Sequence, residues 1–332
     1  MYIARASTSD HSFKCSICHR HDGGTTNEFA GKLQVKASCQ YGCQLHLGCI
    51  PQLTDQQLKL GQRSCSECQK LPLLPLLCGS ESLEEYACHS GNWQALALML
   101  KIKVDHGVSI HVDKRLLFIA VQERKSKCLE LLCMTGANVN AALIDGSTPL
   151  HMAAFYGDTD SLKVLLKIPG VNVSALEEDG FTPLHWAATN GNPGHTDCLK
   201  LLIAHPGVDI NAKDVYGLTP LHWAAAKGNT DSLKLLLDTP RIDIHVTCKL
   251  GLTPLHHAAK WARVDCVEAL LCKGANVNAA ATDRPGTTPL DLARNRSNPA
   301  CAERLIAKGA KTSLELKALE EEARKEQECR LM

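Results

Sequence analysis

Short runs of apolar residues recur along most of the chain with the three-to-four spacing of amphipathic helices. Two clear examples are residues 162–166 and 233–237, and each follows an earlier helical stretch that opens with Thr-Pro-Leu. A similar two-helix rhythm is present at residues 83–100, where Gly91 and Asn92 provide the turn. The pattern predicts pairs of short helices and therefore a mainly α-helical chain.

One motif marks the start of each helix pair. Gly-x-Thr-Pro-Leu occurs five times, at intervals of 34, 37, 34 and 35 residues, and four copies continue into His-x-Ala-Ala. The threonine can cap the first helix, proline suits a first turn whose N–H groups lack partners, and the alanine pair allows close helix packing. A repeat of this period predicts a stacked array. The motif begins at Gly146, Gly180, Gly217, Gly251 and Gly286.

The histidines of the motif are candidates for chemistry, yet their regular position predicts a hydrogen-bonding role inside each repeat. Trp186 and Trp223, one residue after two of them, are expected to pack between helices. No glycine-rich phosphate loop precedes a helix, which argues against a nucleotide-binding enzyme. The histidines are His151, His185, His222 and His256.

The repeat resembles the ankyrin repeat over roughly residues 113–312. The resemblance implies a mainly α fold, an ankyrin-repeat α-solenoid, with about seven repeats in a domain spanning residues 82–312. Its first and last repeats are degenerate caps, as expected where one side of a repeat must face water. Residues 313–332 are expected to form a charged C-terminal helix or tail.

Eight potential zinc ligands lie in the first 68 residues, in four closely spaced pairs. Zinc prefers thiolate and imidazole donors in sets of four, so eight donors suit two structural ions. Residues 12–70 are therefore expected to fold as a small double-zinc domain, joined to the repeats by a proline-containing linker at 71–81. The ligands are Cys15, Cys18, Cys39, Cys43, His46, Cys49, Cys65 and Cys68.

Three double-zinc families fit paired ligands. A plant homeodomain finger normally has a longer central spacer, and a LIM domain normally has its histidine third in the ligand order. The segment from His46 through Cys49 to Ile50 resembles the core of a RING finger. That resemblance implies a cross-braced domain, with Cys15, Cys18, His46 and Cys49 on the first ion and Cys39, Cys43, Cys65 and Cys68 on the second.

The RING resemblance also implies a surface that binds a ubiquitin-conjugating enzyme. The matching positions are Ile17, Ile50 and Leu53, which are apolar, and Gln69, which stands where many active members have arginine or lysine. Ser66 also replaces a common proline. A neutral Gln69 can donate hydrogen bonds but lacks the charge-assisted strength of a guanidinium.

Composition narrows the class of partner and the compartment. The net charge is +1, and acidic and basic residues are interspersed, so neither a nucleic-acid partner nor a membrane surface is expected. Many of the seventeen cysteines have no disulfide-like spacing, and the N-terminus has no apolar signal segment. We therefore expect a cytoplasmic protein with reduced thiols.

Large apolar residues at exposed repeat positions are expected to bind a protein partner. Such positions flank the glycine of each turn or follow the alanine pair of each first helix, and aromatic side chains there are typical interface anchors. We expect them to form a concave substrate-binding face over residues 145–281. They are Phe155, Tyr156, Phe181, Tyr216, Leu218, Leu250, Leu252 and Trp261.

Together these features predict a RING-type ubiquitin ligase whose repeats recruit the protein substrate. The alternative is a non-enzymatic ankyrin-repeat scaffold with a structural zinc finger that mediates protein–protein interaction. The glutamate-rich C-terminus, with Glu320, Glu321 and Glu322, is similar to translocation signals of type IV secreted bacterial effectors. Such an effector would act in the host cytoplasm.

Overall fold

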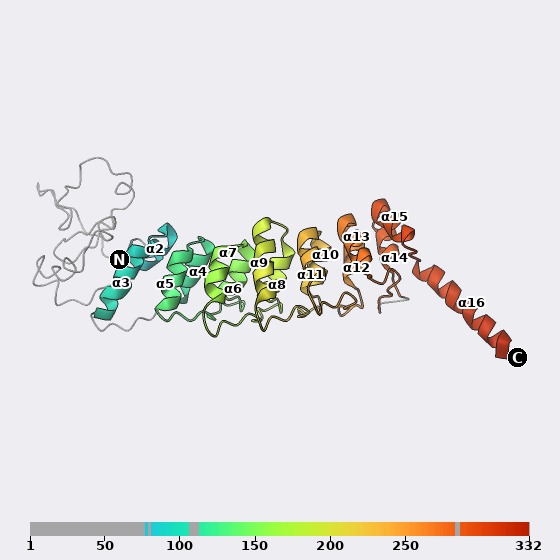
Figure 1. Ribbon diagram of the computed structural model, residues 1–332, viewed down its shortest axis with the longest axis horizontal. Coiled ribbons are helices and arrows are strands. Elements are labelled where there is room, and N and C mark those ends of the chain that lie inside the picture. The colour runs from blue at the N-terminus through green and yellow to red at the C-terminus, as the bar shows by residue number, and fades with distance from the viewer. Residues whose placement is uncertain (1–76, 79–80, 106–112, 283–285, 332) are drawn as a thin grey trace, which may run out of the picture. The chain divides into compact units, whose positions relative to one another are not determined.

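The computed structural model describes residues 77–78, 81–105, 113–282 and 286–331. The chain divides into two compact units, Met1–Ala137 and Asn138–Met332. Helices and strands carry the labels of Figure 1. The zinc ligands and the linker up to residue 76 lie outside the described residues.

The described part of the first unit holds a short antiparallel strand pair and two helix pairs. Asp113 caps the second helix pair, because its carboxylate accepts a hydrogen bond of 2.9 Å from the backbone N–H of Arg115. Leu96, Leu117 and Leu129 are fully buried. The elements are β1 (Leu77–Cys78), β2 (Glu81–Ser82), α2 (Leu83–Ser90), α3 (Trp93–Asp105), α4 (Lys114–Gln122) and α5 (Ser126–Met134).

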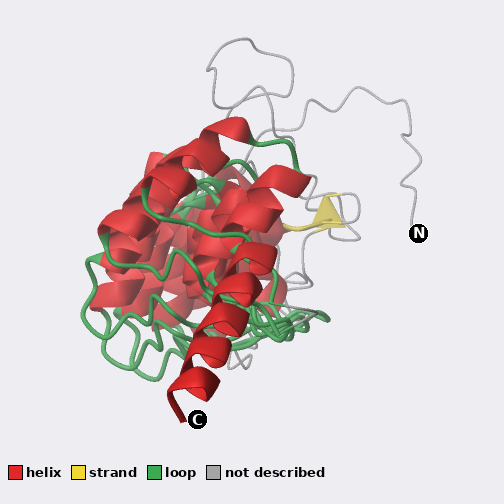
Figure 2. Cartoon of the chain, turned by 90° about the vertical axis from the view of Figure 1, so that its right-hand side faces the viewer, coloured by secondary structure: helices red, strands yellow, loops and turns green. Residues whose placement is uncertain are grey.

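The second unit consists of helix pairs arranged in two layers (Figures 1 and 2). The first helices of successive pairs pack on one another and form the inner layer, and the second helices form the outer layer. The inner layer comprises α6 (Pro149–Tyr156), α8 (Pro183–Thr189), α10 (Pro220–Lys227), α12 (Pro254–Lys260) and α14 (Pro289–Asn295). The outer layer comprises α7 (Thr159–Leu166), α9 (Pro193–Ala204), α11 (Thr230–Leu237), α13 (Val264–Cys272) and α15 (Pro299–Ala307).

Each inner helix starts with the expected threonine and proline. In α10, Thr219 is the N-cap and Pro220 the first helical residue, and the Thr219 backbone N–H donates to Nδ1 of His222 over 3.1 Å. The histidine therefore takes the place of the glutamate or glutamine of a capping box. The buried alanine pair Ala224 and Ala225 completes the close packing between inner helices.

The same histidines connect each repeat to the next one. The other ring nitrogen, Nε2, lies 3.0 Å from the Phe181 carbonyl oxygen in His151 and 3.0 Å from the Leu252 carbonyl oxygen in His222. Since Nδ1 accepts a backbone hydrogen bond, Nε2 must carry the proton and donate it to the carbonyl. The imidazole must be neutral to do both. His185 bonds the Leu218 carbonyl and His256 the Thr287 carbonyl in the same way.

The hairpins that precede the inner helices are joined by backbone hydrogen bonds. The Val215 N–H donates to the Asp179 carbonyl over 3.0 Å, and the Lys249 N–H donates to the Tyr216 carbonyl over 3.0 Å. Gly217 has a φ of +78° at this junction, and an added Cβ would lie 2.9 Å from the Lys249 nitrogen. The glycine of the motif is therefore required by both conformation and packing.

A second set of links joins the loops that follow the outer helices. The Asn211 side chain donates to the Arg241 carbonyl over 2.9 Å and accepts from the Asp243 N–H over 3.0 Å. Asn140 and Asn278 make equivalent pairs of bonds. At the corresponding place in the next repeat stands His245.

The longer interval of 37 residues corresponds to an extension of α9. This helix has 12 residues, whereas α7 and α11 have 8. The additional turn brings in His195, whose Nε2 lies 2.8 Å from the Phe155 carbonyl oxygen. An added Cβ at Gly157 would lie 2.8 Å from the His195 ring, so the extra turn is packed tightly against the end of α6.

The last helix pair ends differently from the others. Asp291 replaces the histidine, and its carboxylate accepts from the Thr288 N–H and from the Ser313 N–H, each over 2.9 Å. Ser313 begins α16 (Ser313–Leu331), a helix of 19 residues with mainly exposed, charged side chains. These hydrogen bonds hold the pKa of Asp291 below its ordinary value despite partial burial.

We expect stability to decrease at acidic pH because the bridging histidines must be neutral. Burial lowers the pKa of His185 to about 4 and that of His222 to about 3. The unfolded chain, with ordinary values near 6.5, binds protons first as the pH falls. The free energy of unfolding should therefore be constant well above pH ~6.5 and fall by roughly 1–2 kcal/mol for each of these two histidines by pH ~5. Urea titrations over this range would measure it.

The matched variant is His222→Gln, which retains a capping acceptor but has no proton to gain. Its pH dependence should be shallower than that of the unaltered chain. Identical slopes for the two proteins would contradict the bridging role.

The asparagine links give a second prediction. Asn211→Ala removes two hydrogen bonds between neighbouring loops and should lower the free energy of unfolding by about 1–2 kcal/mol. His245→Asn introduces the same pair of hydrogen bonds at a position where the chain lacks the asparagine. It should raise the free energy of unfolding by up to about 1 kcal/mol. Chemical denaturation measures both, and an equal change in the two variants would refute the assignment.

Candidate functional site

The residues predicted to bind zinc and the conjugating enzyme all lie outside the described residues. Their ligand sets and contacts therefore stay predictions from the sequence. Within the described ranges, no cluster of three or more His, Cys, Asp or Glu side chains could hold a metal ion. The predicted residues outside the described ranges are the eight zinc ligands together with Ile17, Ile50, Leu53 and Gln69.

Most of the described cysteines are buried, whereas Cys272 and Cys329 are exposed. Cys198 and Cys266 are buried in the outer layer, and their Sγ atoms lie 3.9 Å and 3.7 Å from the hydroxyls of Thr159 and Thr230 in the preceding outer helix. Burial raises the pKa of Cys266, and it raises that of Cys133 to about 11. A thiol with a raised pKa is a poor nucleophile at neutral pH.

Four of the eight residues predicted to bind substrate are exposed. Tyr216 and Leu250 lie at hairpin tips and are 60% and 56% exposed. Phe155 lies near the end of α6, and Trp261 follows α12 with 49% exposure. Tyr156 and Leu218 are partly buried.

The expectation of exposure is wrong for Phe181 and Leu252, which are 8% and 6% exposed. Both follow the hairpin glycine, and their carbonyls accept the histidine bonds from the preceding repeat. Leu252 packs in a small cluster with Cys248 and Ala281. Their side chains therefore belong to the core between repeats, and a partner could not use them as anchors.

Phe181 lies at the centre of an aromatic cluster. Its ring centroid is 5.1 Å from that of Trp186 and 5.1 Å from that of Trp223, and Trp186 is in turn 5.1 Å from Phe155. These contacts confirm that the two tryptophans pack between repeats. The Trp223 Nε1–H also donates to the buried carboxylate of Asp214 over 2.9 Å, which fixes the indole.

A small cavity of about 200 Å³ opens beside Trp223. It lies between the end of α10 and the end of α12, and its walls are two indoles and two cationic side chains. Arg263 is held in place by a 3.2 Å hydrogen bond from Nε to the Ala226 carbonyl oxygen. The lining residues are Trp223, Ala226, Lys227, Trp261 and Arg263.

Charge is segregated along the hairpins and inner helices. The hairpins that precede α6 and α8 carry Asp145, Glu177 and Asp179. Burial raises the pKa of Glu177, and the two neighbouring aspartates raise it further. The hairpins before α10 and α12 carry Lys213 and Lys249, and the acidic side chain beside Lys213, Asp214, is buried.

Sequence reasoning overlooked the cations around the indoles. Lys227 lies 5.8 Å from the Trp223 ring centroid and Lys260 lies 5.6 Å from that of Trp261, both in cation–π geometry. Both lysines occupy the pair of positions after the two alanines, the same positions that identified Trp261. A search that included charge at those positions would have found them.

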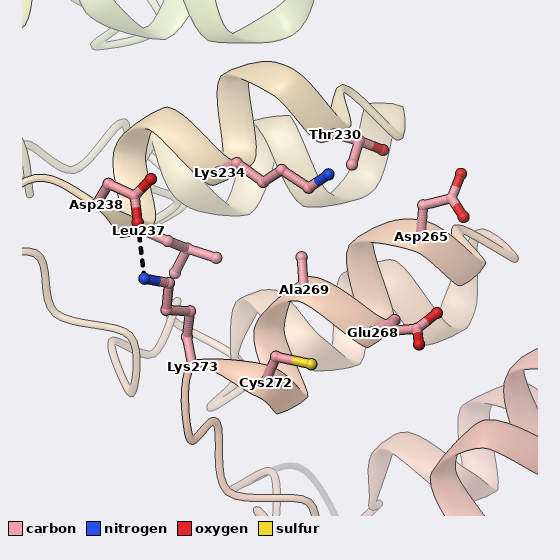
Figure 3. A pocket seen from close by; sticks show the side chains of 9 residues that line it. All are labelled: Thr230, Lys234, Leu237, Asp238, Asp265, Glu268, Ala269, Cys272 and Lys273. Atoms are coloured by element: carbon pink, nitrogen blue, oxygen red, sulfur yellow. Dashed lines mark hydrogen bonds and ion pairs between the residues drawn. The ribbon is translucent and has the colours of Figure 1, made fainter.

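A larger groove of about 490 Å³ lies in the outer layer, between α11 and α13 (Figure 3). It opens beside Ala269, which stands where the preceding outer helix has Leu235. An ion pair of 2.7 Å between Lys273 and Asp238 crosses one end. Its lining mixes both charges, so it favours no class of ligand.

None of the helices that the structure describes has the length and apolar composition needed to cross a bilayer.

Comparison with known proteins identifies the repeated helix pairs as ankyrin repeats. A family model described as ankyrin repeats (3 copies) matches the overlapping segments 117–214, 150–248, 194–281 and 221–315. Together these segments cover residues 117–315, more than half of the 332 residues.

Among solved structures, the chain is similar to the ankyrin repeat domain of Bcl-3, described as a unique member of the IkappaB protein family. The TM-score is 0.57 and the identity 25%, over 67% of this chain and 98% of the other. The fold itself is widely shared, since 527 chains match, so it does not select a partner. The repeat motif, the two-layer architecture and the family match establish that the chain belongs to the ankyrin-repeat family, whose members bind protein partners.

Proposed function

We propose that this protein is a RING-type ubiquitin ligase whose ankyrin repeats recruit the protein substrate. The observation that carries the proposal is the RING-like segment from His46 to Ile50, set within eight paired zinc donors and followed by a protein-binding repeat array. We place the activity in the cytoplasm, or in a host cytoplasm if the chain is a secreted bacterial effector.

Two zinc ions would fold the N-terminal domain and take no part in the chemistry. Each set of four donors would fill the tetrahedral coordination sphere of its ion, which leaves no open position for a reactive water. Metal binding would thus supply folding free energy to a segment too small for a large apolar core. The first ion would be held by Cys15, Cys18, His46 and Cys49, and the second by Cys39, Cys43, Cys65 and Cys68.

The chemical step would rely on positioning. Ile17, Ile50 and Leu53 would bind the conjugating enzyme, which carries ubiquitin as a thioester. A substrate lysine amine would attack the thioester carbonyl, so that a C–N bond forms and the C–S bond breaks, releasing the thiol. Holding amine and thioester together replaces a slow bimolecular encounter, and the ligase needs no nucleophile of its own.

The substrate would bind the inner-layer side of the repeats. Support comes from the exposed Phe155, Tyr216, Leu250 and Trp261, because exposed aromatic and large apolar side chains are typical anchors of protein interfaces. These residues belong to the helix pairs of α6, α10 and α12, and backbone hydrogen bonds link the hairpins that carry Tyr216 and Leu250.

The second candidate function is a non-enzymatic scaffold with a structural zinc domain. Gln69 favours this alternative, since it lacks the charge with which many active RING fingers hold both the enzyme and ubiquitin.

The ligase proposal predicts autoubiquitination by the zinc-loaded full chain with at least one member of a panel of conjugating enzymes. Cys39→Ala should abolish it by opening the second zinc site, and Ile17→Ala should abolish it while two zinc ions remain bound. Lys234→Ala, in the outer layer of the repeats, is the control that should retain full activity. Absence of activity from protein shown to hold two zinc ions would reject the ligase in favour of the scaffold.

Gln69→Arg should increase the rate of ubiquitin transfer about fivefold, because a charge-assisted hydrogen bond is roughly 1 kcal/mol stronger than a neutral one. Single-turnover discharge of the charged conjugating enzyme would measure the rate, and Gln69→Ala should decrease it. If both variants match the unaltered chain, this position does not contact the enzyme.

A further inference from the structure

The cations around the small cavity lack acidic partners among the described residues, whereas several lysines of the outer layer have them. In the outer layer, Lys163, Lys200 and Lys273 each pair with a carboxylate within 3.4 Å. Lys227 and Arg263 form no ion pair with any residue that the structure describes. The same holds for Lys260, which lies 5.6 Å from the Trp261 ring centroid. This patch therefore has positive charge available for a partner.

The patch is also held rigidly. Trp223 is fixed by Asp214, and the Arg263 stem packs over Gly228, where an added Cβ would lie 2.6 Å from Cδ. The Arg263 Nε bond to α10 orients the guanidinium at the cavity rim. Side chains ordered before binding lose less conformational entropy when a partner arrives.

The cavity has room for one side chain of the partner. Its volume of about 200 Å³ is below the range of roughly 300–1,000 Å³ typical of small-molecule sites. Two indoles form its walls, so an aromatic or large aliphatic side chain would bury apolar surface there. The surrounding cations would then face the residues on both sides of that anchor.

From this arrangement we infer that the patch formed by Trp223, Lys227, Lys260, Trp261 and Arg263 binds an acidic peptide segment with one large apolar anchor. The anchor enters the cavity between the two indoles, and flanking carboxylates pair with the lysines and Arg263. The inference rests on the proposed protein-binding role of the repeats and names the chemistry of the segment they recognise.

A nucleic acid could also use cations and indoles, but the neighbouring repeats disfavour it. A single strand that followed the array would bring its phosphates past Glu177, Glu178 and Asp179. A short peptide confined to α10 and α12 avoids those carboxylates. The local charge pattern therefore favours a compact acidic segment over an extended polyanion.

The test uses the full chain and a fluorescent peptide with a central phenylalanine between runs of glutamate and aspartate. Lys227→Glu and Trp261→Ala should each weaken binding about tenfold or more, measured by fluorescence anisotropy. Lys234→Glu is the matched control, because it makes the same change of charge on an exposed lysine in the outer layer. It should leave the affinity within about twofold. Replacing the peptide's phenylalanine by serine should weaken binding like Trp261→Ala.

Two results would overturn the inference. Equal weakening by Lys227→Glu and Lys234→Glu would show attraction to overall charge, and displacement by an oligothymidine strand at lower concentration than unlabelled peptide would identify a nucleic-acid site. The assay contains no conjugating enzyme. A chain that binds the peptide specifically but transfers no ubiquitin would therefore keep this inference and reject the ligase proposal alone.

Discussion

The neutral imidazole that joins one repeat to the next is the interaction on which the array depends. His222 illustrates it: one ring nitrogen completes the cap of its own helix, and the other donates to the Leu252 carbonyl of the following hairpin. That carbonyl also accepts the Cys248 N–H, which closes the hairpin itself. A single side chain thus sets the start of a helix, the geometry of the next turn and the distance between them. A protonated ring could not accept the cap bond, which ties the architecture to the charge of the histidine.

Because these links hold the repeats together, the exposed side chains at the hairpin tips and inner-helix ends are available to bind a partner. Each repeat packs against its neighbours through buried leucines, the alanine pair and a few buried polar groups, as expected for an array stabilised by nearest-neighbour contacts. The hairpin backbones are linked by hydrogen bonds, but the exposed side chains of Tyr216, Leu250 and Trp261 take no part in these contacts. Tyr216, Leu250 and Trp261 can therefore vary in character without weakening the stack. Asp291 shows how the series ends, because its carboxylate caps α14 and receives the first N–H of α16 instead of reaching another hairpin.

The repeat period, the helix pairs and the bond of each histidine to the cap of its own helix could be predicted because each depends on residues close together in the sequence. The exposure of Phe181 could not, because it depends on the neighbouring repeat. The residue after the hairpin glycine points between repeats, where Trp186 and Trp223 cover it, whereas Tyr216, before the glycine, stays outside. The extra turn of α9 is another example. The interval of 37 residues revealed an insertion, but only packing on Gly157 shows where His195 lies.

The candidate site illustrates why patterns of residue type underdetermine recognition. Trp223 was correctly predicted to pack between repeats, and it does so on one face of the indole through Phe181. The same ring also lines the cavity beside Trp261 and Arg263, between the ends of α10 and α12. A residue can thus be both core and binding surface. What distinguishes this site from the other inner-helix ends is the combination of a fixed indole, an open volume and cations without acidic partners. Each of these is a property of two adjacent repeats together, so no single repeat sequence could reveal it.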